Sequence, residues 1–189
     1  MTLVFFLEEL SAKEMVKGVV PRILPADIDV RCVVFDGKQD LEKQIEKKIK
    51  NWLQPDTKFV ILRDKDSGDC LAIKRGLYEK CKNAGRDDTL IRIACHELES
   101  WYLGDLEAVE AGLNMHGIAQ LQNNHKFRVP DNLANAPQEL YSLTKKKYQK
   151  VSGSRDISRY LKIDGSNKSY SFNVFIDGIR KIITTKNKD

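Results

Sequence analysis

The sequence is poor in cysteine and has no two cysteines close together. Its four cysteines, Cys32, Cys70, Cys81 and Cys95, are spread over the central part of the chain and show the spacing of neither a zinc site nor a disulfide framework. We therefore expect a reducing compartment, the cytoplasm, as the location of the protein.

Long apolar runs are also missing. No stretch approaches the roughly 20 apolar residues of a membrane helix, and the early run LVFFL lacks the basic start and the cleavage site of a signal peptide. We interpret LVFFL as a buried strand and expect no membrane partner. The chain has no internal repeats, and because it has no GxxxxGK[ST] loop, it does not bind nucleotide triphosphates by that route.

What the sequence does contain is a regular alternation of apolar runs with segments of helical period. Residues 2–7, 29–35, 58–62 and 89–95 read as strands, and 11–23, 41–53, 69–82 and a segment from about 97 read as helices, with Ser11 as the expected cap of the first helix. Because each strand is almost entirely apolar, the pattern predicts an α/β fold with a four-stranded parallel sheet flanked by helices.

Charge divides the chain into two parts. Residues 1–113 carry 18 Lys and Arg against 21 Asp and Glu, whereas residues 114–189 carry 14 against 6. We therefore predict a sheet domain over 1–113 that carries an acidic site, and a basic α-rich extension over 114–189 that offers a surface for an anionic partner. The extension should pack on the sheet domain as one compact unit, with one helix near 137–148 and a closing amphipathic segment. Ordinary solubility is the alternative reading of the basic part.

Acidic residues follow three of the four expected strands. They are Glu8 and Glu9, Asp64 and Asp66, and Glu97 and Glu99. Because the carboxyl ends of parallel strands meet at one edge of a sheet, these side chains should lie close together. Like charges held together need a cation, and carboxylate oxygens suit Mg²⁺ or Mn²⁺. The sequence therefore predicts a divalent metal site suited to phosphoryl transfer.

Each acidic segment also has a structural reading. Asp69 or Ser67 could cap the third helix. The two acids after the first strand could lie in a solvated loop, and Glu99 could face solvent on the opposite side of a helix from Glu97. The conjunction of acids on three strands favours the metal site over these alternatives.

Other motifs fail on spacing. A calcium loop beginning at DKDSGD would need Gly where Asp69 stands and Glu where Arg75 stands. HELES begins like the helix of zinc proteases, but Ser100 occupies the position of the second His. His116 and His125 are interpreted as surface or packing residues.

Four segments, FLEELSAKEM, DKDSGDC, ACHELESWYLGD and YQKVSGSR, resemble the bacterial Toprim-like family labelled domain of unknown function 4276. The resemblance covers nearly the whole chain. A Glu after the first strand, DxD after the third and acids after the fourth are similar to the Toprim domains of type II topoisomerases, primases and OLD nucleases.

The resemblance implies a Mg²⁺- or Mn²⁺-dependent nuclease that acts on DNA or RNA. Glu8 would be a metal ligand or general base, Asp64 and Asp66 metal ligands, and Glu97 a ligand of a second metal. Lys150 would approach the scissile phosphate, as a lysine does in OLD nucleases. An ABC-type ATPase encoded in the same two-gene bacterial defence system is the implied partner.

The first motif departs from the EGxxE pattern of related nucleases. Glu9 stands in place of the Gly and Ala12 in place of the second acid, for which Glu9 or Glu14 could substitute. This departure leaves open a non-catalytic sensor module that docks on an ATPase. A phosphohydrolase of small nucleotides is a further alternative.

Five basic residues within eleven positions are predicted to contact nucleic acid: Lys145, Lys146, Lys147, Lys150 and Arg155. Such residues contact phosphates without reading sequence, so binding should depend strongly on salt.

Overall fold

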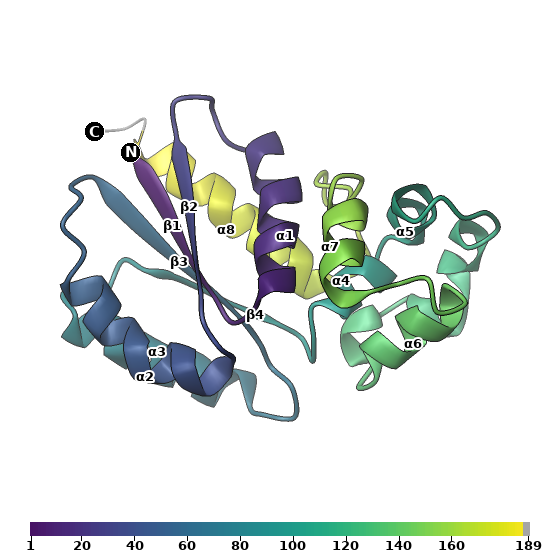
Figure 1. Cartoon of the computed structure of the whole chain (residues 1–189), viewed down its shortest axis with the longest axis horizontal. Helices are drawn as coiled ribbons and strands as arrows, with labels where there is room; N and C mark the ends of the chain where they lie inside the picture. Colours follow the sequence, from purple (N-terminus) through teal and green to yellow (C-terminus); the bar gives the residue numbers. More distant parts are fainter. Residues whose placement is uncertain (187–189) are drawn as a thin grey trace.

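The computed structural model describes residues 1–186 and has a four-stranded parallel sheet with strand order β2-β1-β3-β4 (Figure 1). The strands are β1 (Thr2–Leu7), β2 (Asp29–Val34), β3 (Thr57–Asp64) and β4 (Leu90–Ala94). All three strand pairings are parallel. The α/β class, the four strands and their parallel pairing are confirmed.

The remaining described chain is mostly helical. The α-helices are α1 (Leu10–Val19), α2 (Lys38–Lys50), α3 (Cys70–Asn83), α4 (Glu99–Leu103), α5 (Leu106–Gly112), α6 (Ala136–Leu143), α7 (Lys150–Ser158) and α8 (Tyr170–Lys186). Short 3₁₀ turns lie at Val20–Arg22, Ala119–Asn123, His125–Phe127 and Pro130–Asn132. Within residues 1–186, no helix combines the length and the apolar character needed to cross a membrane.

Both faces of the sheet are covered at its centre, which explains why β1 is almost continuously apolar and fully buried. In β1, Leu3, Phe5 and Leu7 belong to a buried cluster that includes α1 and the later helices. Val4 and Phe6 belong to a second cluster formed with α2 and α3. Side chains of a strand alternate between its two faces, so a strand buried on both sides has no position for a solvated residue.

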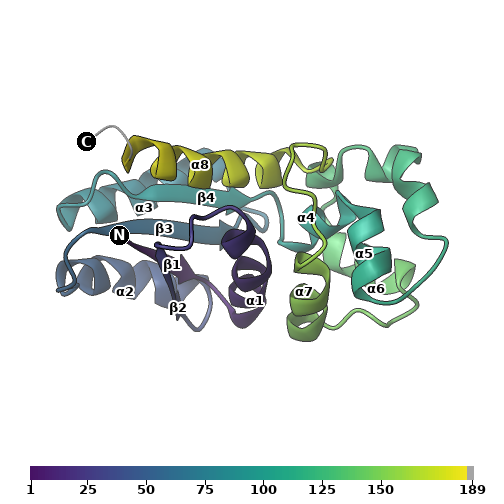
Figure 2. The ribbon, with the colours of Figure 1, turned by 90° about the horizontal axis from the view of Figure 1, so that it is seen from above.

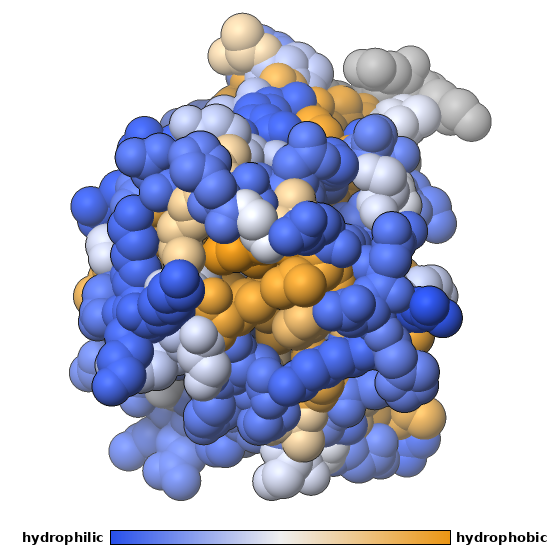
Figure 3. Space-filling view, turned by 90° about the vertical axis from the view of Figure 1, so that its right-hand side faces the viewer, coloured by the Kyte–Doolittle hydropathy of each residue, from blue (hydrophilic) through white to orange (hydrophobic). Residues whose placement is uncertain are grey.

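The second half of the chain builds onto the same core. Helices α4 to α7 form a lobe beyond the carboxyl ends of the strands, and α8 returns along β4 (Figure 2). Phe175 of α8 lies with its ring centre 6.5 Å from that of Phe5 and 5.2 Å from that of Trp101. The larger buried cluster therefore contains residues from both sides of Leu113, although the predicted domain boundary itself stays a prediction. On the outer face of the lobe, apolar atoms gather in a patch surrounded by hydrophilic side chains (Figure 3).

Three details of the expected helices are wrong. The residue that precedes α1 as its N-cap is Glu9, with extended backbone, and the Ser11 hydroxyl donates to the Glu9 carboxylate instead of capping the helix. The first helix also ends at Val19 and continues as a 3₁₀ turn containing Pro21, because proline has no N–H for an α-helical hydrogen bond. The segment after β4 forms two short helices instead of one.

The helix predicted near 137–148 ends early, at Leu143. Lys145 and Lys146 have φ values of 51° and 68°, in the left-handed region. A right-handed helix cannot continue through two such residues. Part of the lysine tract therefore forms a turn instead of a helix face.

Close packing of α5 against α7 gives a test of the lobe. A Cβ at Gly112 would lie 2.6 Å from the Cα of Ile157, whereas a Cβ at Gly76 in α3 would meet no atom within 4 Å. We expect Gly112→Ala to destabilise the protein by about 1–3 kcal/mol through overpacking. Gly76→Ala should stabilise it by up to about 1 kcal/mol through helix propensity.

Thermal unfolding followed by circular dichroism measures both effects, at roughly 2–4 °C per kcal/mol for a chain of this size. Equal melting temperatures for the two variants would contradict the packing of α5 on α7.

Candidate functional site

Carboxylates from three strand ends gather at the carboxyl edge of the sheet. We call this group the acidic edge and define it by its members: Glu8, Glu9, Asp64, Asp66, Glu97 and Glu99. The main-chain N–H of Asp64, the last residue of β3, donates to Glu8 Oε2 over 3.3 Å. Charges of Glu99, Glu8 and Glu9 all act on Asp64. The acids that follow β1, β3 and β4 therefore lie within electrostatic range of one another.

Ionisation of this cluster is unfavourable. Burial raises the pKa of Asp64 well above its ordinary value, and the carboxylates of Glu99 and Glu8 raise it further. Burial, followed by the charge of Glu99, also raises the pKa of Glu97. At Glu8, burial raises the pKa more than the hydrogen bond from Asp64 lowers it. A cation bound here would relieve both the desolvation and the repulsion.

Glu99 is the most deeply buried acid of the edge, with 1% of its surface exposed. Its Oε1 accepts a hydrogen bond from the Tyr148 hydroxyl over 2.8 Å, and burial raises its pKa. Its Oε2 is buried and has no hydrogen-bond partner among the described residues. The alternative that Glu99 faces solvent is wrong, because every residue of α4 is buried.

Lys150, the first residue of α7, reaches the acidic edge. Its Nζ lies 2.8 Å from Glu9 Oε2. Burial lowers the pKa of Lys150, but the hydrogen bond to Glu9 and the charges of Glu99 and Asp64 outweigh this effect and raise it. Lys150 therefore stays protonated at the acidic edge, and its predicted role at a phosphate stays a prediction.

Two further cations neutralise part of the edge. Lys38 Nζ lies 2.7 Å from Asp66 Oδ2. Arg63 is buried, with its Nη1 2.7 Å from Glu42 Oε1 and its Nε 3.9 Å from Glu8 Oε2. Neither residue was predicted to belong to the site. A signal was available only for Lys38, which follows the end of the second strand as the acids follow the others.

Helices α1 and α7 both begin at this edge, since Glu9 precedes α1 and Lys150 opens α7. The amino end of a helix carries partial positive charge, which favours nearby carboxylates. Tyr148, the donor to Glu99, packs against α7 so closely that a Cβ on Gly153 would lie 2.4 Å from the tyrosine ring. The chain that follows α6 therefore fixes both Lys150 and Glu99.

The donor set fits a hard cation in its chemistry, but its geometry is not that of a preformed cage. Carboxylate oxygens suit Mg²⁺ or Mn²⁺, and Glu99 Oε2 is a buried oxygen without a hydrogen-bond partner in the described chain. In residues 1–186, however, no group of three or more His, Cys, Asp or Glu side chains is arranged to hold a metal. Asp66 and Glu9 are instead paired with Lys38 and Lys150.

Two other acids have structural roles. Asp69 is the N-cap of α3, where its carboxylate accepts from the N–H groups of Leu71 and Ala72, so the capping alternative holds for this residue. Glu14 lies on α1, and its Oε2 is 2.6 Å from the Nε of Arg155 on α7. Of the two acids that could replace the second acid of the first motif, Glu9 belongs to the acidic edge, whereas Glu14 forms ion pairs with Lys17 and Arg155.

The five basic residues predicted to bind nucleic acid occupy different settings. Lys150 lies at the acidic edge, and Arg155 is held by Glu14 on the side of α1. Lys145 and Lys146 lie in the turn after α6, and Lys147 Nζ donates to the main-chain carbonyl of Asn114 over 3.2 Å. Three of the five residues therefore belong to the turn after α6 and two to α7.

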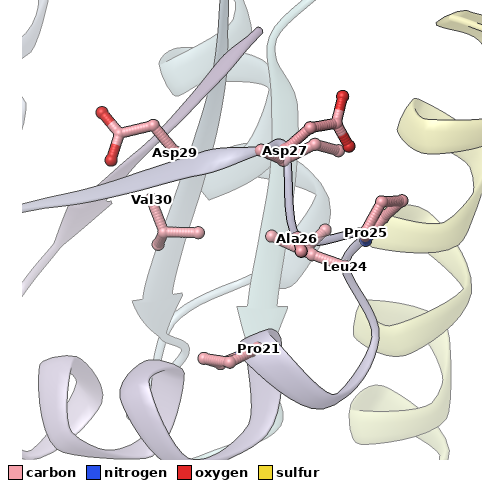
Figure 4. A pocket seen from close by; sticks show the side chains of 8 residues that line it. Pro21, Leu24, Pro25, Ala26, Asp27, Asp29 and Val30 are labelled. Carbon is pink, nitrogen blue, oxygen red and sulfur yellow. The ribbon is translucent and has the colours of Figure 1, made fainter.

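A separate surface hollow lies near the amino ends of the strands. The turn after α1 and the start of β2 line it, and Figure 4 shows the carboxylates of Asp27 and Asp29 pointing away from Pro21. Asp29 pairs in register with Thr2, the first residue of β1. Since the acidic edge lies at the other ends of the strands, this hollow is not part of the candidate site.

The raised pKa of Asp64 predicts a pH-dependent stability. Folding raises this pKa, so the folded state holds the proton more tightly, and the stability penalty is absent below the unfolded pKa of about 4 and grows as the pH rises above it. Asp64→Asn should therefore raise the melting temperature at pH 7 in EDTA, and the gain should vanish below about pH 4.

Thermal unfolding followed by circular dichroism from about pH 3 to about pH 8, a range that includes the ordinary pKa of an aspartate, measures this difference in melting temperature. Asp87→Asn, which removes an exposed carboxylate, serves as the control and should not change stability. A lower melting temperature for Asp64→Asn at pH 7 would show that its charge is favourably paired.

Comparison with known proteins identifies a family for this chain but no individual relative. No curated protein and no solved structure matches the chain. A family model described as domain of unknown function (DUF4276) matches residues 7–180, which include the whole acidic edge and α7. Because the match spans almost all of the chain, the protein belongs to this family of domains of unknown function.

Proposed function

We propose that the protein is a Mg²⁺- or Mn²⁺-dependent nuclease that hydrolyses phosphodiester bonds of DNA or RNA at the acidic edge. The observation that carries the proposal is the gathering of carboxylates with raised pKa values from three strand ends. Such a cluster opposes folding unless a cation joins it, so selection for stability alone would not favour it. The similarity of its motifs to Toprim and OLD nucleases supports the same function.

The residues have distinct roles in this proposal. Asp64 and Asp66 would hold one cation and Glu97 a second. A bound metal would stabilise negative charge on the phosphate and its leaving oxygen. Glu8 would be either a further ligand of the metal or the general base that accepts a proton from the attacking water. The Lys150 ammonium, held beside Glu9, would bind a nonbridging phosphate oxygen.

The lysine pairs set a condition for activity. Asp66 Oδ2 lies 2.7 Å from Lys38 Nζ, so a cation that binds this oxygen must displace the lysine. An exposed pair of this kind contributes about 1 kcal/mol or less, so a divalent ion can replace the lysine. The proposal also includes the cytoplasm as the location and an ABC-type ATPase as the partner whose effector this protein would be.

A non-catalytic binding module is the second candidate. It is favoured by the arrangement of the described residues, in which no three acidic, His or Cys side chains form a metal site. Lysines neutralise Asp66 and Glu9 in that arrangement. In this case the edge would recognise a cationic or polar group of a partner protein instead of a metal and a phosphate.

The nuclease proposal predicts loss of cleavage on removal of either DxD aspartate. Asp64→Ala and Asp66→Ala should each lower Mn²⁺-dependent cleavage of plasmid and of tRNA by roughly 100-fold or more, because metal binding contributes several kcal/mol. Asp29→Ala, which removes a carboxylate at the opposite end of the strands, is the matched control and should retain activity. Folded Asp64→Ala and Asp66→Ala proteins that cleave at the rate of the unmodified chain would refute the site.

Calorimetry separates the two candidates. If Lys38 competes with the metal for Asp66, Lys38→Ala should bind Mn²⁺ about two- to fivefold more tightly than the unmodified protein. Lys58→Ala, which breaks a similar exposed pair with Asp88 over 2.8 Å, should leave the affinity unchanged. An absence of binding in both the unmodified and the Lys38→Ala protein at millimolar Mn²⁺ would favour the binding module.

A further inference from the structure

Helices α1 and α7 run side by side away from the acidic edge (Figure 1). Successive contacts join them: Lys150 with Glu9 at the edge, then Arg155 with Glu14 one to two turns further on. Beyond these pairs, a Cβ on Gly18 would lie 2.0 Å from a serine hydroxyl of α7, so the two backbones are in close contact. The two helices are therefore tightly packed along a line of contact that starts at the candidate site. We call this line the seam and define it by its contacts, from Lys150 with Glu9 to Gly18 with the end of α7.

The far part of this seam is hollowed and strongly basic. The charged residues that line the hollow are Glu14, Lys17, Arg22, Arg155 and Arg159. Four of them are cations and one is an anion, with Gly18 and Pro21 completing the lining. No comparable excess of positive charge exists at the acidic edge itself, where carboxylates outnumber the cations.

The ion pairs of these residues do not neutralise all of the positive charge in the hollow. Glu14 accepts from Arg155 over 2.6 Å and lies 3.6 Å from Lys17, and the hydrogen bond from Arg155 lowers its pKa, so it stays ionised and holds both cations in place. Arg22 Nη1 donates to the main-chain carbonyl of Ser158 over 3.3 Å, which fixes its guanidinium without neutralising it.

Arg159 extends the same face of α7 by one turn beyond Arg155. It is exposed, and no carboxylate in residues 1–186 forms an ion pair with it. Asp156 is the other acid close to Arg155 and is only half-exposed. One ionised Glu14 and one Asp156 do not neutralise four cations.

We propose that this seam binds the phosphate backbone of a single nucleic-acid strand and leads it into the acidic edge. The inference deepens the proposed nuclease function and rests on it. From Lys150 to Arg159 the helix rises roughly 14 Å, so Lys150, Arg155 and Arg159 would contact different phosphates of one strand. Guanidinium groups bind phosphate oxygens in pairs, which suits a site made mainly of arginines.

The shape of the surface favours a strand over other polyanions. An anionic membrane would bring its headgroups against the carboxylates of the edge as well as against the seam, and repulsion there would oppose binding. A strand contacts the seam along its length and presents a single phosphate to the edge. Lys147 is directed elsewhere, since its Nζ donates to the main-chain carbonyl of Asn114. Lys145 and Lys146 lie in the turn that precedes α7 and do not line the hollow.

Binding of a fluorescent 20-nucleotide single strand, measured by anisotropy in EDTA, tests the seam without any cleavage. Arg155→Ala combined with Arg159→Ala should weaken binding by about tenfold or more. The slope of log affinity against log salt should fall by about 1.4 in magnitude, since two phosphate contacts are lost from a single strand. Arg159→Ala alone, which breaks no ion pair among the described residues, should give about half of that slope change.

The matched control is Lys145→Ala combined with Lys146→Ala, which removes the same charge from the turn after α6. It should change the affinity by less than about twofold. Equal losses in the two double variants, unchanged binding in the arginine variant, or binding to anionic lipid vesicles without binding to the oligonucleotide would each overturn the proposal. Intact binding by Asp64→Ala together with lost cleavage would support the seam and the nuclease separately.

Discussion

Repulsion among carboxylates at the carboxyl edge of the sheet is the constraint on which the site depends. Parallel strands bring their ends together, so acids after β1, β3 and β4 meet whatever the sequence between them. Burial raises the pKa of Asp64 and of Glu99, and Asp64 lies within range of the charge of Glu99. The fold therefore maintains a site whose charged form is costly unless a cation, from the chain or from solution, is present.

The second half of the chain supplies what the sheet domain lacks. Helix α7 brings Lys150 to the edge, and Tyr148 donates the hydrogen bond that orients Glu99. Gly153 and Gly112 permit the close packing that fixes this helix between its neighbours. The site is thus shared between the sheet and the helical lobe, and its chemistry depends on how firmly the two pack together.

The sheet could be predicted because β1 and most of β3 are buried on both faces and so appear as apolar runs. That acids after β1, β3 and β4 lie within electrostatic range of one another followed from parallel topology alone. The burial of Glu99 could not be predicted, because it depends on how a five-residue helix packs under the lobe. The pairing of Lys38 with Asp66 joins residues far apart in sequence, and no local pattern encodes it.

The basic tract shows a similar limit. Five cations within eleven positions suggested one binding surface, but left-handed backbone at Lys145 and Lys146 ends the helix and separates this turn from α7. The cations that do share a surface, Arg22 and Arg159 among them, come from two helices distant in sequence. Charge composition predicted an anionic partner, whereas which cations lie together could be seen only in the tertiary structure.

The most direct test of the acidic edge is the titration of the Asp64 side-chain carboxyl, followed by its carbon NMR shift with and without Mg²⁺. Burial and repulsion predict a midpoint well above the ordinary value of about 3.9 in EDTA, and a lower midpoint when Mg²⁺ is added. An ordinary or depressed midpoint in EDTA, or a midpoint that Mg²⁺ does not change, would contradict the account.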